Sequence, residues 1–160
     1  MKQVIFIFGL FIAVTMGLSD DVTERMAEFL MLSKTDVQIC VNKTSVTIED
    51  LAKLNQLVDD NVETADIDKS VSKVGCFFAC LLQKKEIMSG SYINVEKLKE
   101  FVDVRYNTGR SPNPRHIVAR NRIFDTCAEQ VKSKTDECEV TIKFILCLIL
   151  EAKRFKETFM

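Results

Sequence analysis

The chain has 160 residues, which is enough for one domain, and carries a formal charge of −1 with six cysteines and one histidine. The lack of a basic excess argues against a nucleic-acid partner. Only five Gly and two Pro are present, beside many Leu, Ile, Lys and Glu. This composition favours an all-α protein over a fold of strands and turns.

The first 19 residues have the pattern of a secretory signal peptide. Lys2 supplies the positive charge, and Val4–Val14 gives an apolar run of about 11 residues before small and polar residues. A membrane span needs roughly 20 apolar residues, so this run is too short to anchor the chain. The alternative is a retained anchor or a buried helix. We expect 1–19 to be removed and 20–160 to be a single, secreted, extracellular helical domain.

Hydrophobic periodicity predicts six helices after the signal peptide. They are expected at about 21–40, 47–58, 70–85 and 95–102, from about 115 to 131, and at about 136–156. The acidic stretch Asp59–Asp68 and the Pro-containing stretch Asn107–Pro114 are expected as loops. In the last helix, Phe144–Leu150 is apolar on every side. Such a helix should be central, with neighbours on all faces.

All six cysteines follow the expected signal peptide. An even number of cysteines in a small exported domain predicts three disulfides, but spacing alone does not choose among the many possible pairings. Cys76 and Cys80 lie one helical turn apart on one face, so each can tie its helix to a different segment. A zinc site is disfavoured, because the chain is expected outside the cell and has a single histidine. We expect no metal and no cofactor.

The cysteine order and spacing resemble the framework of the insect odorant-binding proteins, the six-cysteine type that includes pheromone-binding and general odorant-binding members. Three residues separate the cysteines in Cys76-Phe-Phe-Ala-Cys80, and eight separate Cys138 from Cys147. Cys40 precedes the first pair and Cys127 precedes the second. The resemblance covers almost the whole chain after the signal peptide. The stretch from Cys80 to Cys127 is longer than is common in the family, and Asn107–Pro114 is where we expect the extra length.

The resemblance implies an all-α fold, in which a six-helix, disulfide-linked compact bundle encloses an apolar cavity. It also implies the disulfide pairs Cys40–Cys80, Cys76–Cys138 and Cys127–Cys147. Offsets from these cysteines place the ligand-binding pocket at Phe78, Leu82, Phe124, Phe144 and Leu148, and helical periodicity adds Met26, Leu30, Met88 and Phe101. A solidly packed core is the alternative for each of the nine residues, since an apolar stripe looks the same in both.

The function implied by the resemblance is a secreted carrier that reversibly binds small hydrophobic ligands, such as odorants, pheromones or similar lipid-like molecules. Its partners would be a small apolar ligand and a membrane odorant receptor, without stable membrane insertion, and the chain would be a monomer or a weak homodimer. No Gly-x-Ser-x-Gly or His-Glu-x-x-His motif is present, so no catalytic residue and no enzyme activity are expected. The alternative is a secreted structural or signalling helical protein with a solid core and no ligand.

Three further features have two interpretations each. Four arginines lie close in sequence, and we prefer a solvated face to a contact with anionic lipid or a receptor; they are Arg110, Arg115, Arg120 and Arg122. His116 is expected to be an exposed spectator rather than a catalytic or pH-sensing group. The tail after Cys147 is expected to fray at its end, the alternative being a segment that covers the cavity. Asn42-Lys-Thr44 is a glycosylation sequon in an expected loop.

Overall fold

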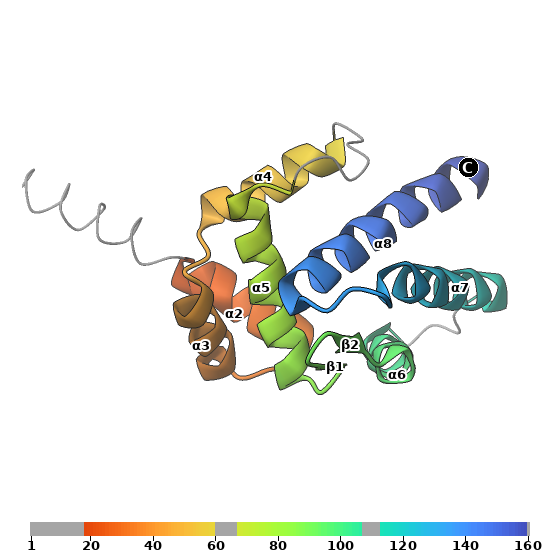
Figure 1. The fold of residues 1–160 in the computed structure, drawn as a ribbon. Helices are drawn as coiled ribbons and strands as arrows, with labels where there is room; N and C mark the ends of the chain where they lie inside the picture. Colours follow the sequence, from red (N-terminus) through yellow and green to blue (C-terminus); the bar gives the residue numbers. More distant parts are fainter. Residues whose placement is uncertain (1–17, 60–66, 107–112, 160) are drawn as a thin grey trace, which may run out of the picture.

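A computed structural model describes residues 18–59, 67–106 and 113–159 of the chain. These residues form seven helices and one short hairpin, so the all-α class is confirmed and the prediction of six helices is one helix short (Figure 1). The helices are α2 (Asp20–Leu30), α3 (Lys34–Thr44), α4 (Ile48–Asp59), α5 (Lys69–Lys84), α6 (Val95–Tyr106), α7 (Pro114–Val131) and α8 (Glu137–Phe159). Most of the expected signal peptide and parts of both expected loops lie outside the described residues.

The helix predicted at 21–40 is wrong, because the chain breaks there into α2 and α3. Met31 ends α2 in the left-handed conformation, with φ of 51°, and its N–H donates to the carbonyls of the preceding turn. Ser33 then starts α3, since its hydroxyl oxygen accepts a hydrogen bond from the N–H of Asp36 at 3.0 Å. A serine three residues before an acidic residue is a sequence signal for a helix start, and here it outweighs the apolar period that suggests one continuous helix.

Thr47 and Asp50 cap the start of α4, which agrees with the helix expected from about residue 47. The carboxylate of Asp50 accepts hydrogen bonds from the N–H and the hydroxyl of Thr47, both at 3.0 Å. The Thr47 hydroxyl oxygen in turn accepts from the N–H of Asp50 at 3.2 Å. This reciprocal arrangement satisfies backbone donors that the first turn of a helix leaves unpaired.

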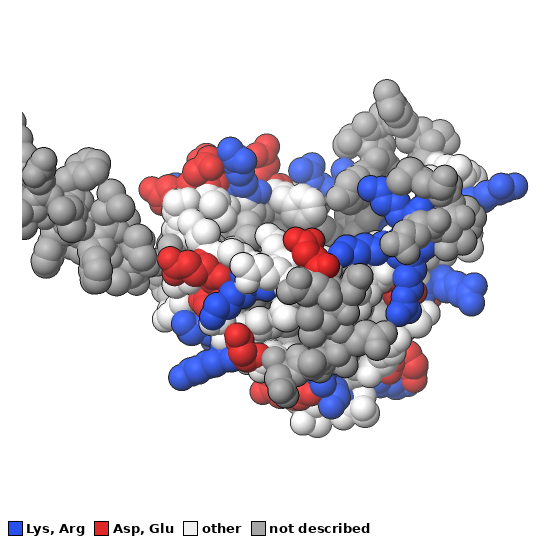
Figure 2. Space-filling model, turned by 90° about the horizontal axis from the view of Figure 1, so that it is seen from above, with Lys and Arg blue, Asp and Glu red and all other residues white. Residues whose placement is uncertain are grey.

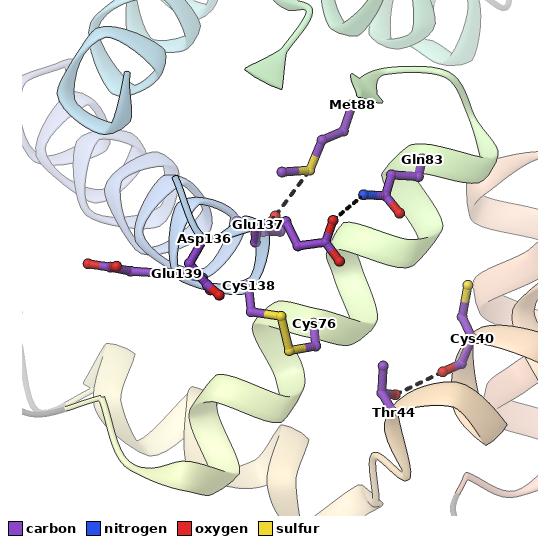
Figure 3. The surroundings of a disulfide bond; sticks show 10 residues. Cys40, Thr44, Cys76, Gln83, Met88, Asp136, Glu137, Cys138 and Glu139 are labelled. Carbon is purple, nitrogen blue, oxygen red and sulfur yellow. Dashed lines mark hydrogen bonds between the residues drawn. A yellow bond between two sulfur atoms is a disulfide. The ribbon is translucent and has the colours of Figure 1, made fainter. Parts of the chain in front are cut away.

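The crossing of α5 and α8 is the centre of the molecule (Figure 1). Gly75 makes the close approach possible: a Cβ added there would lie 2.4 Å from the carbonyl oxygen of Cys138. Next to it, Cys76 and Cys138 form a disulfide, and the Gln83 amide donates to the Glu137 carboxylate at 2.7 Å (Figure 3). A covalent bond and a hydrogen bond therefore fix the two helices at a contact that only glycine permits.

The predicted break after α5 contains the hairpin. Strands β1 (Met88–Ser89) and β2 (Tyr92–Ile93) pair antiparallel, with Met88 opposite Ile93. Gly90 lies in the turn with φ of 57°, a conformation that glycine adopts without steric cost. The hairpin turns both Met88 and Ile93 into the core.

Three disulfides join four of the helices. Cys40 of α3 pairs with Cys80 of α5, Cys76 of α5 with Cys138 of α8, and Cys127 of α7 with Cys147 of α8. These are the three pairs that the family resemblance implies. Because the bonded segments overlap along the sequence, opening any one helix would strain a bond to another.

The last helix is central only in its first half. Val140, Ile142 and Phe144 are buried, whereas the side chains at 148–150 are only partly buried. The apolar stretch Phe144–Leu150 therefore begins inside the core and ends near the surface. Within the described ranges, no helix is long and apolar enough to cross a membrane.

Candidate ligand-binding site

The nine residues predicted to bind ligand divide between two apolar clusters. Six of them meet in what we call the α6–α8 cluster, which collects side chains from α5, β1, α6, α7 and α8; they are Leu82, Met88, Phe101, Phe124, Phe144 and Leu148. The other three, Met26, Leu30 and Phe78, pack in a separate α2–α5 cluster around the Cys40–Cys80 disulfide. The structure thus brings together two thirds of the predicted set.

The α6–α8 cluster is built from large side chains that differ in burial. Phe124 and Phe144 are buried, while Leu82, Phe101 and Leu148 are partly buried at its edge. Met88 has three rotatable bonds and a polarisable sulfur, so it can adapt its shape to irregular space. The cluster thus has two buried aromatic rings with partly buried side chains around them.

Two cations lie against aromatic rings of this cluster. The Lys85 ammonium is 5.1 Å from the centroid of the Phe101 ring, and the Arg120 guanidinium is 5.8 Å from that of Phe124. Arg120 also binds the Asp103 carboxylate at 2.6 Å, which ties α7 to α6. The predicted solvated basic face is therefore wrong for Arg120, which is a structural contact between helices.

Buried polar side chains in the described residues all have hydrogen-bond partners. The Thr23 hydroxyl donates to the Ser19 carbonyl at 3.0 Å, and the Thr141 hydroxyl donates to the Glu137 carbonyl at 2.8 Å. An unpaired buried polar group costs free energy, and a polar ligand could supply its missing hydrogen bond. Here every buried polar side chain of the described residues is already paired, so a ligand needs no polar group to satisfy it. The interior is chemically matched to an uncharged, apolar molecule.

Asp50 is the one carboxylate of the described chain that is buried, with 6% of its surface exposed. Burial by itself would raise its pKa, but the hydrogen bonds from Thr47 and Ser70 and the charge of Lys73 outweigh it and hold the pKa below the ordinary value. The Lys73 ammonium lies 3.7 Å from this carboxylate. Asp50 is therefore ionised at neutral pH and acts as a structural cap on α4.

A hollow that the sequence did not predict lies between the first half of α7 and the last turns of α8. It has a volume of about 930 Å³, and we call it the α7–α8 groove. Its apolar walls are Pro114, Val118, Ala119, Ile123 and Phe155, and its charged side chains are Arg115, Arg122, Glu151 and Arg154. None of the nine predicted residues lines it. The basic run near 115–122, interspersed with apolar residues, was the signal that could have revealed it.

Other residues of the sequence prediction fall at or near the surface. His116 is exposed, as expected, and its ring meets the Phe155 ring edge-on at 5.9 Å. Asn42 lies in the last turn of α3, so the expectation that its sequon is in a loop is wrong. Among the described residues, no group of three His, Cys, Asp or Glu side chains is placed to hold a metal ion.

These features define a class of protein: a small helical domain, braced by three overlapping disulfides, with an apolar interior. A model of the PBP/GOBP family matches residues 22–151. The chain belongs to this family, and the resemblance inferred from the cysteine spacing is confirmed.

Curated relatives are similar over about two thirds of their length. The pheromone-binding protein Gp-9 of Solenopsis geminata is 27% identical over 112 residues, which are 70% of this chain and 69% of the relative. Gp-9 of Solenopsis quinquecuspis is 28% identical over 110 residues, covering 69% of this chain and 68% of the relative. Gp-9 of Solenopsis xyloni has the same identity and coverage as the first.

Proposed function

We propose that this protein is a secreted carrier that reversibly binds small hydrophobic ligands and transports them through extracellular fluid. The observation that carries the proposal is the α6–α8 cluster, where six predicted side chains from five elements meet inside a disulfide-braced frame. Membership of the PBP/GOBP family and the pheromone-binding relatives support the same function.

The proposed ligand is uncharged and largely aliphatic. Burying about ten methylene groups contributes roughly 8 kcal/mol at ~0.8 kcal/mol each. The loss of translational freedom on binding opposes this, which leaves a dissociation constant in the micromolar range or weaker. Reversible binding of this strength suits a carrier that must also release its cargo.

The proposed binding mode uses the adaptable edge of the α6–α8 cluster. Leu82, Phe101 and Leu148 are partly buried there, so they can move outward while the disulfides hold the helices in place. The guest would then lie against Phe124 and Phe144. Met26, Leu30 and Phe78 belong to the α2–α5 cluster. We propose that they form a second ligand-binding surface, which a guest would reach across α5.

Secretion belongs to the same proposal. A signal peptide at 1–19 would deliver the chain to an oxidising compartment, where three disulfides form and persist. Residues 20–160 would then be the mature ligand-binding domain, delivering odorants or pheromones to a membrane receptor.

Displacement of a fluorescent probe tests the proposal. The oxidised chain without residues 1–19 should bind N-phenyl-1-naphthylamine and release it when 1-dodecanol is added. Leu148→Ala should weaken probe binding about fivefold, because each lost methylene contact is worth up to ~0.8 kcal/mol. Ile39→Ala is the matched control, since Ile39 is exposed on α3 and outside both clusters.

Two results would contradict the proposal. A protein that is folded and fully oxidised yet binds neither probe nor alcohol would favour a structural or signalling protein with a solid core. Equal weakening by Leu148→Ala and Ile39→Ala would mean that the probe adheres to the surface and not to the α6–α8 cluster.

A further inference from the structure

The α7–α8 groove combines an exposed apolar strip with a cationic rim. Val118 has 69% of its surface exposed, whereas Phe124, Cys127 and Val131 on another face of α7 are buried. Ile123 and Phe155 continue the strip along the groove. Ile123 and Phe155 are partly exposed, and apolar side chains that line one hollow, unlike scattered ones, indicate a contact surface.

The charges on the groove are mostly positive. Arg115, Arg122 and Arg154 face a single carboxylate, that of Glu151, which binds Arg154 at 2.9 Å. Within the described parts of the chain, neither Arg115 nor Arg122 forms an ion pair. Figure 2 shows Lys and Arg prevailing over Asp and Glu at the end of the molecule where α8 ends. The groove therefore has an unbalanced positive charge beside its apolar strip.

The shape of the groove fits a single alkyl chain. Its walls extend from Pro114 to Thr126 along α7, which at about 1.5 Å of rise per residue is roughly 18 Å. The volume of about 930 Å³ lies within the range of known small-molecule sites. An open hollow of this length can accommodate an extended alkyl chain.

The arginines at the rim of the α7–α8 groove favour a ligand with an anionic head group. A guanidinium presents paired N–H donors that match the two oxygens of a carboxylate. Of the two cations beside the α6–α8 cluster, Arg120 already pairs with Asp103, so a carboxylate buried there would have at most Lys85 as a partner and would carry a large desolvation cost. In the groove, the head group of the ligand stays at the rim beside the arginines, while its alkyl chain covers Val118 and Ile123.

From these observations we propose that the α7–α8 groove is a binding site for a free long-chain carboxylic acid, distinct from the α6–α8 cluster that receives neutral guests. The inference rests on the proposed carrier function, since it adds a ligand class to it. Arg115 and Arg122 hold the carboxylate, and Val118, Ile123 and Phe155 hold the alkyl chain.

The test compares two probes of equal chain length by isothermal titration calorimetry of the oxidised protein. Replacing both arginines (Arg115→Gln with Arg122→Gln) should weaken dodecanoate binding about tenfold, because partly exposed charge-assisted hydrogen bonds are lost. Binding of 1-dodecanol should change less than twofold. Arg25→Gln removes one positive charge from exposed α2, far along the sequence, and should leave dodecanoate affinity unchanged.

Val118→Ser gives an independent measure, because it shortens the apolar strip and leaves every charge in place. It should weaken dodecanoate severalfold and leave the fold intact, since the residue is exposed. The inference is overturned if the double arginine variant binds dodecanoate like the unaltered protein. It is also overturned if Arg25→Gln weakens dodecanoate binding as much as the double arginine variant does.

The outcomes separate this inference from the proposed function. If 1-dodecanol binds and the arginine variants have no effect on dodecanoate, the groove assignment fails and the carrier function stands. If neither ligand binds, the carrier function fails and the groove assignment fails with it. If the protein binds vesicles of phosphatidylglycerol through these arginines but not dodecanoate, the surface recognises a membrane and the inference is wrong.

Discussion

Replacing Gly75 with alanine should destabilise the folded protein, although alanine is the better helix former. A Cβ at this position would lie 2.4 Å from the carbonyl oxygen of Cys138 and 3.0 Å from the Cβ of Ile142. The nearest atom belongs to the backbone of α8, so it cannot move aside by changing a side-chain rotamer. The two central helices would have to separate beside the Cys76–Cys138 disulfide.

Two opposing terms set the size of the effect. Alanine gains about 1 kcal/mol over glycine inside a helix. Overpacking of a close contact typically costs 1–3 kcal/mol, and a contact with backbone lies at the upper end of that range. The expected net loss is about 1–2 kcal/mol in the free energy of unfolding, or several degrees in the melting temperature of a chain of this size.

Urea unfolding of the oxidised protein, followed by far-ultraviolet circular dichroism, measures this loss. Ala52→Gly supplies the helix-propensity term, because Ala52 is exposed within α4 and has no close contact to release. Subtracting it isolates the steric cost at Gly75. A Gly75→Ala variant as stable as the unaltered protein, or more stable, would refute the close crossing of α5 and α8.

Three further predictions concern a cap, a disulfide and the binding site. Asp50→Asn should lower the free energy of unfolding by about 1–2 kcal/mol near neutral pH. Because the pKa of Asp50 is below its ordinary value of 3.8 in the folded state, its stabilising effect is present above that pH and is lost as the pH falls through the folded pKa. Unfolding curves at pH 6 and pH 2.5 should therefore show a gap between variant and parent that narrows in acid, and a constant gap would contradict this. Replacing Cys127 and Cys147 together with serine should cost about 3 kcal/mol for a closed loop of 20 residues, measured by thermal unfolding, and no loss would contradict a role for this bond in stability. Phe78→Ala should weaken binding of the fluorescent probe, whereas unchanged affinity would exclude Phe78 from the binding surface.

The sequence predicted helices best where caps and periodicity agreed. The helix start expected near residue 47 agrees with the Thr47–Asp50 cap of α4, and Cys76 and Cys80, one turn apart on one face, marked a helix bonded to two other segments. The break between α2 and α3 was missed because the apolar period of α2 suggested continuity. Only the cap at Ser33 and the left-handed Met31 reveal that the chain turns there.

The candidate site was predictable in part, for a physical reason. Offsets from cysteines fix positions along a helix, so side chains one turn from a disulfide were expected near one another, and Phe124, Phe144 and Leu148 do meet. Phe78 joins a different cluster from Leu82, although the two lie one turn apart on α5. Periodicity gives the face of a helix but not which neighbour covers it.

The basic run near 115–122 pointed to a surface on α7, but the α7–α8 groove itself depends on how far two helices diverge beyond their disulfide. The exposure of Val118, at 69% of its surface, is a property of the folded structure. The arginines around it are common on solvated helix faces. Their placement at one hollow is a property of the tertiary structure.

A crystal structure of the oxidised chain grown with 1-dodecanol tests the carrier function most directly. The account predicts electron density for the alkyl chain against Phe124 and Phe144, with Leu82, Phe101 or Leu148 displaced from its position in the unliganded protein. The account would be contradicted if the side chains of the α6–α8 cluster kept their unliganded positions and no ligand density appeared there at saturating alcohol.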